Sequence, residues 1–200
     1  MAPDAFADLL KEFGSRFGPE VLATTVDHWA RRVESHLDAK TPVIAEVPYG
    51  DDARHRMDLF PVKAHGAPMV LFVHGDGFAA GEGQVASSFY TNVGRYFAAH
   101  GMLGARMNYR AAPTVGWPEA AQDLDGAVAW LLDRADLYGG DPGRLVVIGH
   151  SAGAGRVATW LLDDAFRGGA RERLKSAGLM SGSYEAVAPL SVGQSPCLGG

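Results

Sequence analysis

Cysteine is almost absent from this sequence, because Cys197 is the only one among its 200 residues. An intrachain disulfide is therefore impossible, and a cysteine-based metal site is not expected. No apolar run approaches the ~20 residues that a membrane span needs. The amino terminus, MAPDAFADLLKEF, is acidic and amphipathic, unlike a secretory signal. These absences predict a soluble, cytoplasmic protein with no membrane span, no metal and no other cofactor.

An excess of basic charge is also lacking. The formal net charge is −5, which provides neither the footprint of a nucleic-acid-binding protein nor a polybasic membrane signal. Internal repeats and low-complexity tracts are absent. A chain of this length suits one domain with a real hydrophobic core.

Strand and helix patterns alternate along most of the chain. Apolar spacing predicts helices at residues 4–13, 20–37, 87–99, 118–138 and 152–166. Short apolar runs predict strands at residues 43–47, 57–60, 69–73, 103–108, 145–148 and 174–180. Asp141-Pro142-Gly143 is expected to form a turn before the fifth strand. Alternation of this kind predicts a doubly wound, mostly parallel α/β sheet with functional sites at the carboxyl ends of its strands.

Two glycine-rich loops follow buried strands at that edge of the sheet. The stretch RLVVIGHSAGAG, residues 144–155, combines a strand, a G-x-S-x-G turn around Ser151 and the start of a helix. So tight a turn strains the serine backbone, and a side chain on Gly149 or Gly153 would collide with neighbouring elements. The second loop, His74-Gly75-Asp76-Gly77-Phe78, follows the strand at 69–73. Each loop taken alone could be only a tight turn, but the presence of both loops favours a catalytic site.

That chemistry is nucleophilic catalysis. A serine hydroxyl needs a base to take its proton and hydrogen-bond donors to hold the oxyanion that forms after attack. The backbone N–H of Ala152, directly after Ser151, is one candidate donor. The N–H groups of Asp76 and Gly77 in the other glycine loop are the remaining candidates.

These motifs resemble those of the α/β-hydrolases of the hormone-sensitive-lipase, carboxylesterase and kynurenine-formamidase-like group. His74–Phe78 is similar to its HGGG[FW] oxyanion loop, and Gly149–Gly153 to its GxSAG elbow; Asn108-Tyr109-Arg110 with Pro113, and Gly139-Gly140-Asp141-Pro142, also match. The resemblance covers roughly residues 45 to 185. It implies an α/β-hydrolase fold acting on a small-molecule ester or amide.

The resemblance also assigns roles. It implies that Ser151 is the nucleophile and that the amides of Asp76, Gly77 and Ala152 form the oxyanion hole. It further implies that residues 1–40 are an N-terminal helical cap and that residues 41–200 are the hydrolase core. The oligomeric state is left open.

The sequence departs from the pattern of this group in two ways. Position 76 is usually glycine, and a carboxylate beside a developing oxyanion would raise the barrier unless it turns away or is protonated. The catalytic acid and histidine of the fold follow the serine, but no histidine follows His150 here. We therefore expect an incomplete core that lacks the last strands and helices of the sheet.

Other side chains have structural or open interpretations. His74 is expected to order its loop, although it is also a substitute base to consider; the side chain of His150 should point away from the serine hydroxyl. Asp123 and Asp125 are predicted to be structural, with Arg110 pairing with one of them. The remaining histidines are expected to be solvated: His28, His36, His55, His65 and His100. Packing is favoured over an acyl pocket for three aromatic residues: Phe89, Tyr90 and Trp117.

Three functions follow from these features. The first is a serine hydrolase of the carboxylic-ester type. The second is a catalytically impaired hydrolase or a small-molecule-binding pseudoenzyme. The third, a nucleotide-binding doubly wound protein, is weak because neither glycine loop has dinucleotide or Walker spacing.

Overall fold

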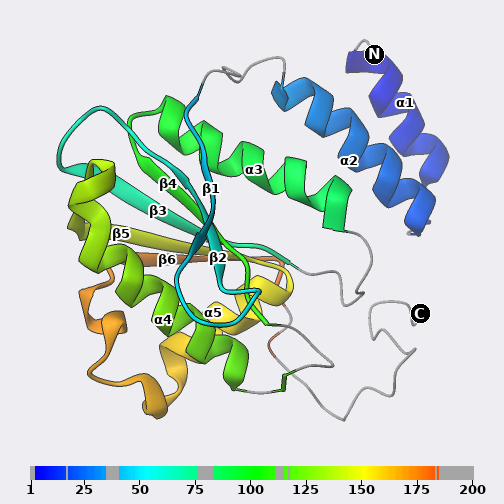
Figure 1. The fold of residues 1–200 in the computed structure, drawn as a ribbon. Coiled ribbons are helices and arrows are strands. Elements are labelled where there is room, and N and C mark those ends of the chain that lie inside the picture. Colours follow the sequence, from blue (N-terminus) through cyan, green and yellow to red (C-terminus); the bar gives the residue numbers. More distant parts are fainter. Residues whose placement is uncertain are drawn as a thin grey trace.

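The computed structural model describes residues 3–16, 18–34, 41–75, 83–110, 115–116, 118–182 and 184. In this part of the chain a six-stranded sheet lies between two layers of helices (Figure 1). The strands are β1 Ile44–Pro48, β2 Arg56–Phe60, β3 Ala67–Val73, β4 Leu103–Met107, β5 Gly140–His150 and β6 Ser176–Met180. The helices are α1 Pro3–Phe13, α2 Pro19–Glu34, α3 Gly83–Ala99, α4 Glu119–Arg134 and α5 Ala152–Leu162.

The strand order is β1-β2-β4-β3-β5-β6. β1 pairs antiparallel with β2, and β2 antiparallel with β4. β3 is parallel to β4 and to β5, and β5 is parallel to β6. The prediction of a doubly wound, mostly parallel sheet is therefore confirmed.

The main apolar core lies between the sheet and the layer that holds α4 and α5. It joins inward side chains of four strands to one face of α4, including Met69, Leu71, Leu103, Leu124 and Leu131, each fully buried. Trp160 of α5 is also fully buried, and its indole N–H donates to Asp125 Oδ1 of α4 at 2.8 Å. The indole satisfies its only donor, as a buried tryptophan requires, and this bond ties α5 to α4.

Helix α3 covers the opposite face of the sheet, with α1 and α2 beyond it (Figure 1). Its backbone approaches the strands closely, because a Cβ placed on Gly94 would lie 2.1 Å from the Phe60 ring. A Cβ on Gly104 of β4 would lie 2.6 Å from Gly94 O. Glycine at both positions therefore allows this helix to lie directly on β2 and β4.

An ion pair is buried within the sheet. Asp58 of β2 and Arg106 of β4 are direct cross-strand partners, 6% and 7% exposed. Arg106 Nη2 donates to Asp58 Oδ2 at 2.6 Å. Asp58 Oδ1 accepts from the backbone N–H of Glu46 at 3.0 Å, where β1 has an irregular register and Glu46 adopts a φ of 57°. One carboxylate thus neutralises a buried guanidinium and holds the edge strand.

The structure differs from the expected elements mainly at their ends. β5 begins at Gly140 rather than near residue 145. Gly140 pairs with Ala67 and Leu145 with Met69, so the residues between loop out of the ladder. The predicted turn persists inside that loop, where Gly143 N–H donates to Asp141 Oδ1 at 2.8 Å. Helix α4 ends at Arg134 and continues as a 3₁₀ turn, and residues 35–37 of the second predicted helix lie outside the described part.

Candidate active site

Ser151 forms the sharp turn between β5 and α5. Its φ of 53° and ψ of −122° lie in a region that non-glycine residues rarely adopt. A Cβ on Gly149 would lie 2.6 Å from Gly153 O, and one on Gly153 would lie 2.2 Å from Val73 O. The predicted strained turn with two obligatory glycines is therefore confirmed.

The turn is fastened on both sides. Ser151 N–H donates to Met180 O of β6 at 2.9 Å, and Ser151 O accepts from Ala154 N–H at 2.9 Å. Ala152 is the first residue of α5, so its N–H has no carbonyl one turn earlier within the helix to bond to. The positive end of the helix dipole also lies here. The turn thus places a hydroxyl beside a helix terminus that favours negative charge.

The second glycine loop begins next to this turn. β3 and β5 run parallel, and Val73 pairs with Gly149. A Cβ on Gly75 would lie 2.9 Å from Ser151 Cβ and 3.2 Å from His150 O. The start of the His74–Phe78 loop therefore contacts Ser151, as expected for two loops at one sheet edge. Two predicted oxyanion-hole residues, Asp76 and Gly77, lie outside the described residues.

The His74 side chain is held in place by its neighbours. Its Nδ1 is 2.9 Å from Gly75 O, and its Nε2 is 3.2 Å from Asn108 Oδ1. Its ring stacks between Tyr90 at 5.4 Å and Tyr109 at 5.0 Å. Both of these oxygens are acceptors, so a neutral imidazole donates to one of them. This contact and the stacking favour the predicted loop-ordering role over that of a base.

His150, the residue before the serine, faces α3. Its Nδ1 lies 3.4 Å from the Tyr90 hydroxyl. Burial lowers the pKa of His150 below its ordinary value, because a low-dielectric environment disfavours the charged form.

That lowered pKa predicts a pH dependence of stability. As pH falls through about 6.5, the unfolded chain protonates residue 150 while the folded chain does not, so stability decreases. We expect the loss of unfolding free energy between pH 7.5 and 5.5 to be smaller in His150→Gln than in the parent protein. Urea unfolding at both pH values measures this loss of unfolding free energy. The control is His65→Gln, which removes an exposed histidine. An equal loss in His150→Gln and the parent would contradict the prediction.

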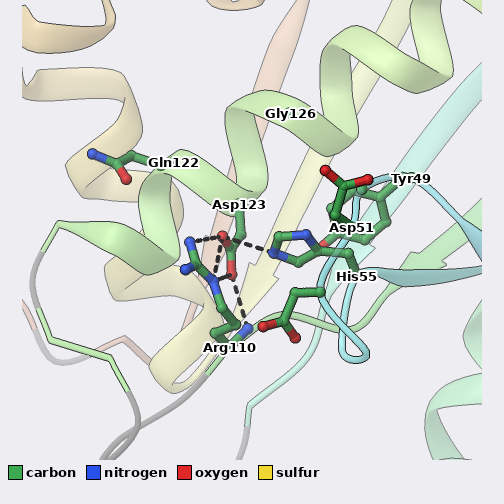
Figure 2. A pocket seen from close by; sticks show the side chains of 9 residues that line it. Tyr49, Asp51, His55, Arg110, Gln122, Asp123 and Gly126 are labelled. Carbon is green, nitrogen blue, oxygen red and sulfur yellow. Dashed lines mark hydrogen bonds and ion pairs between the residues drawn. The ribbon is translucent and has the colours of Figure 1, made fainter.

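A second polar cluster lies two strands from Ser151 along the same edge of the sheet. Figure 2 shows its side chains. Arg110 donates to Asp123 Oδ1 from its Nη2 at 2.6 Å, and its backbone N–H donates to Asp123 Oδ2 at 2.9 Å. The prediction that Arg110 pairs with one of the two aspartates is confirmed. Burial acts to raise the pKa of Asp123, but the hydrogen bonds from Arg110 and the charge of His55 outweigh it, so the pKa is lowered.

His55 belongs to this cluster, which corrects its expected solvation. Its side chain is only 15% exposed, and its Nε2 lies 3.0 Å from Asp123 Oδ1, at an angle outside hydrogen-bond geometry. Its ring stacks on Tyr49 at 5.0 Å. These residues line a pocket of about 630 Å³ with the 50–52 turn and α4. Within the cluster, Asp123 neutralises Arg110. The contact between His55 and Asp123 also joins the β1–β2 turn to α4.

Metal and membrane sites were not expected from the sequence. Among the described residues, no group of three or more His, Cys, Asp or Glu side chains could hold a metal ion. Within the same ranges, no helix combines the length and apolar character of a membrane span. The side chains of Phe89 and Trp117 lie outside the described part of the molecule, whereas Tyr90 is half-buried against Phe72 and His74.

Several curated proteins that are similar to this chain are named esterases. The protein named probable isoprenylcysteine alpha-carbonyl methylesterase ICME from Oryza sativa subsp. japonica is 32% identical over 127 residues, which are 62% of this chain and 29% of that protein. Esterase LipC from Mycobacterium tuberculosis is 34% identical over 112 residues, which are 54% of this chain and 27% of that protein. The chain therefore matches less than a third of the length of these relatives.

Solved structures agree on the fold. The hyperthermophilic esterase from Pyrobaculum calidifontis has a TM-score of 0.65 at 22% identity and covers 91% of this chain and 58% of its own. The thermostable carboxylesterase EstE1, cloned from a metagenomic library, has a TM-score of 0.53 at 28% identity and covers 80% of this chain and 54% of its own. The BD-FAE family model matches residues 57–161, which include β2 to β5, the serine turn and most of α5. This α/β-hydrolase chain therefore belongs to the BD-FAE family.

Proposed function

We propose that this protein is a serine hydrolase of carboxylic esters, with Ser151 as the nucleophile. The observation that carries the proposal is the conformation of Ser151: a strained φ of 53° between β5 and α5, against Gly75. Backbone strain of this kind persists where the surrounding structure enforces it, and it concentrates at active sites. The esterase names of the relatives support the same reaction.

The reaction would proceed by acyl transfer. Ser151 Oγ attacks the ester carbonyl carbon while its proton passes to a general base, a role that we assign to none of the described residues, and the resulting oxyanion is held by backbone N–H groups. The C–O bond to the alcohol then breaks, and the alcohol leaves with a proton. Water attacks the acyl-enzyme and releases the carboxylic acid. We assign the oxyanion contacts to the N–H groups of Asp76, Gly77 and Ala152.

The helical segment 1–40 is proposed to be a cap that covers the substrate. Helix α2 packs against α3, and α3 follows the loop that begins at His74. Phe6 of α1 stacks on His28 of α2 with ring centroids 3.6 Å apart, so the two helices form one paired unit. We infer from this pairing that α1 and α2 act as a single element of the cap.

A fluorophosphonate probe tests the nucleophile. Such probes phosphonylate serines that their surroundings activate. Because we assign no base to Ser151, we expect slow labelling that reaches one label per chain on Ser151 after long incubation, and none in Ser151→Ala. Intact mass spectrometry and peptide mapping measure the label. Ser181→Ala, which removes another serine with positive φ, is the matched control and should label like the parent. A parent protein that remains unlabelled would instead favour the impaired hydrolase or binding-only alternative.

A further inference from the structure

The backbone at His74 and Gly75 sets the space around Ser151. A Cβ on Gly75 would lie 2.9 Å from Ser151 Cβ, so little separates the two backbones. Gly75 also directly precedes the residues assigned to the oxyanion hole. A small displacement of this segment would therefore change the space around the Ser151 side chain. The position of the His74–Gly75 backbone must therefore be fixed by contacts with other residues.

Tyr109 contacts this segment in two ways. Its hydroxyl donates to His74 O at 2.5 Å, and its ring stacks on the imidazole of His74 with an interplanar angle of 22°. Arg156 of α5 lies on the tyrosine ring with its Cζ 4.3 Å from the centroid. Tyr109 is fully buried, so its ring, which packs against the imidazole and the guanidinium, has little freedom to move away.

The backbone around Tyr109 is itself anchored by other elements. Arg54 Nε, from the β1–β2 turn, donates to Tyr109 O at 3.0 Å. Asn108 N–H donates to Arg56 O at 2.8 Å. On the other side, Arg110 N–H donates to Asp123 Oδ2 of α4. Because these anchors do not involve the serine loops, Tyr109 is a fixed support that the His74–Gly75 segment rests on.

We propose that Tyr109 is a positioning residue for the oxyanion loop: its hydroxyl and ring fix the backbone of His74 and Gly75 beside Ser151. This inference rests on the proposed function for its kinetic consequence. A misplacement of about 1 Å in a catalytic group can lower turnover about a hundredfold. The loop would act on the oxyanion, which exists only after attack, so its loss affects kcat rather than substrate binding.

The test compares Tyr109→Phe with Trp160→Phe. Both truncate a fully buried aromatic residue and delete one hydrogen bond, but Trp160 bonds to Asp125 on α4 rather than to the serine loops. For p-nitrophenyl acetate, with the Ser151→Ala signal subtracted, we expect Tyr109→Phe to lower kcat 10- to 100-fold and to leave KM within about twofold. We expect Trp160→Phe to keep kcat within about twofold after correction for the folded fraction.

A second readout does not depend on turnover. Ring currents from Tyr90 and Tyr109 act on the His74 imidazole, so its proton NMR shifts report the stacking. We expect these shifts to change in Tyr109→Phe and to stay unchanged in Trp160→Phe. Unchanged shifts in Tyr109→Phe, or a kcat equal to that of the parent, would overturn the positioning role. A parent protein that neither labels nor hydrolyses esters would instead overturn the proposed function, and the NMR shifts would still decide the role of Tyr109.

Discussion

We expect a polypeptide of residues 1–200, studied by itself, to hydrolyse p-nitrophenyl acetate about 10⁴- to 10⁶-fold more slowly than an esterase with a complete triad, because a site without its base loses activity on this scale while oxyanion stabilisation remains. No histidine follows His150 in the sequence. Each ring nitrogen of His74 lies beside an acceptor oxygen, and His150 faces Tyr90. We therefore expect neither ring to take the proton of Ser151.

Added imidazole provides the matching experiment. A small base that enters the site should act as the general base and raise the hydrolysis rate of this polypeptide. Imidazole also cleaves this substrate by itself, so the rate with Ser151→Ala at each imidazole concentration is the background to subtract. A fast parent rate without imidazole that Ser151→Ala abolishes would contradict this prediction. His74→Ala would then be the first variant to measure.

The second large effect is expected in stability. Asp58→Ala should lower the free energy of unfolding by about 3–5 kcal/mol, because it leaves the buried Arg106 guanidinium without its carboxylate. It also removes the acceptor for Glu46 N–H. Asp133→Ala breaks an exposed pair with Arg173 and should cost at most about 1 kcal/mol. Chemical denaturation of both variants measures the difference.

The double variant Asp58→Leu with Arg106→Leu separates charge from packing. Replacing both partners of a buried pair by apolar residues is often neutral or stabilising, so we expect it to be more stable than Asp58→Ala. A loss for Asp58→Ala no larger than that for Asp133→Ala would show that water reaches the guanidinium. Such a result would mean that the ion pair does not contribute to the stability of the pairing between β2 and β4.

Local patterns predicted the elements that bury a regular face. The apolar runs of β3 and β4 and the helical spacing of Leu124, Val128 and Leu131 all appear where expected, because their periodicity directly reflects burial. The strain at Ser151 was also predictable, since glycines on both sides of a serine between a strand and a helix leave few other conformations.

The parts that sequence alone missed depend on distant contacts. His55 lies in a polar turn that reads as solvent-exposed, yet its ring packs on Tyr49 and contacts Asp123, 68 positions later. The early start of β5 arises because Gly140 pairs with Ala67 across a turn-like insertion. The support of His74 by Tyr109 joins residues 35 positions apart. No local periodicity encodes contacts of this kind.

At position 151, the residue that would give the most stable backbone differs from the residue that provides a hydroxyl. A non-glycine residue with this φ and ψ costs on the order of 1–3 kcal/mol, and glycine would adopt the same conformation without that cost. Selection for heat resistance alone would therefore drift toward glycine at position 151 and discard the hydroxyl. Persistence of serine in a population under such selection would be a signature that the hydroxyl is in use, readable without any substrate in hand.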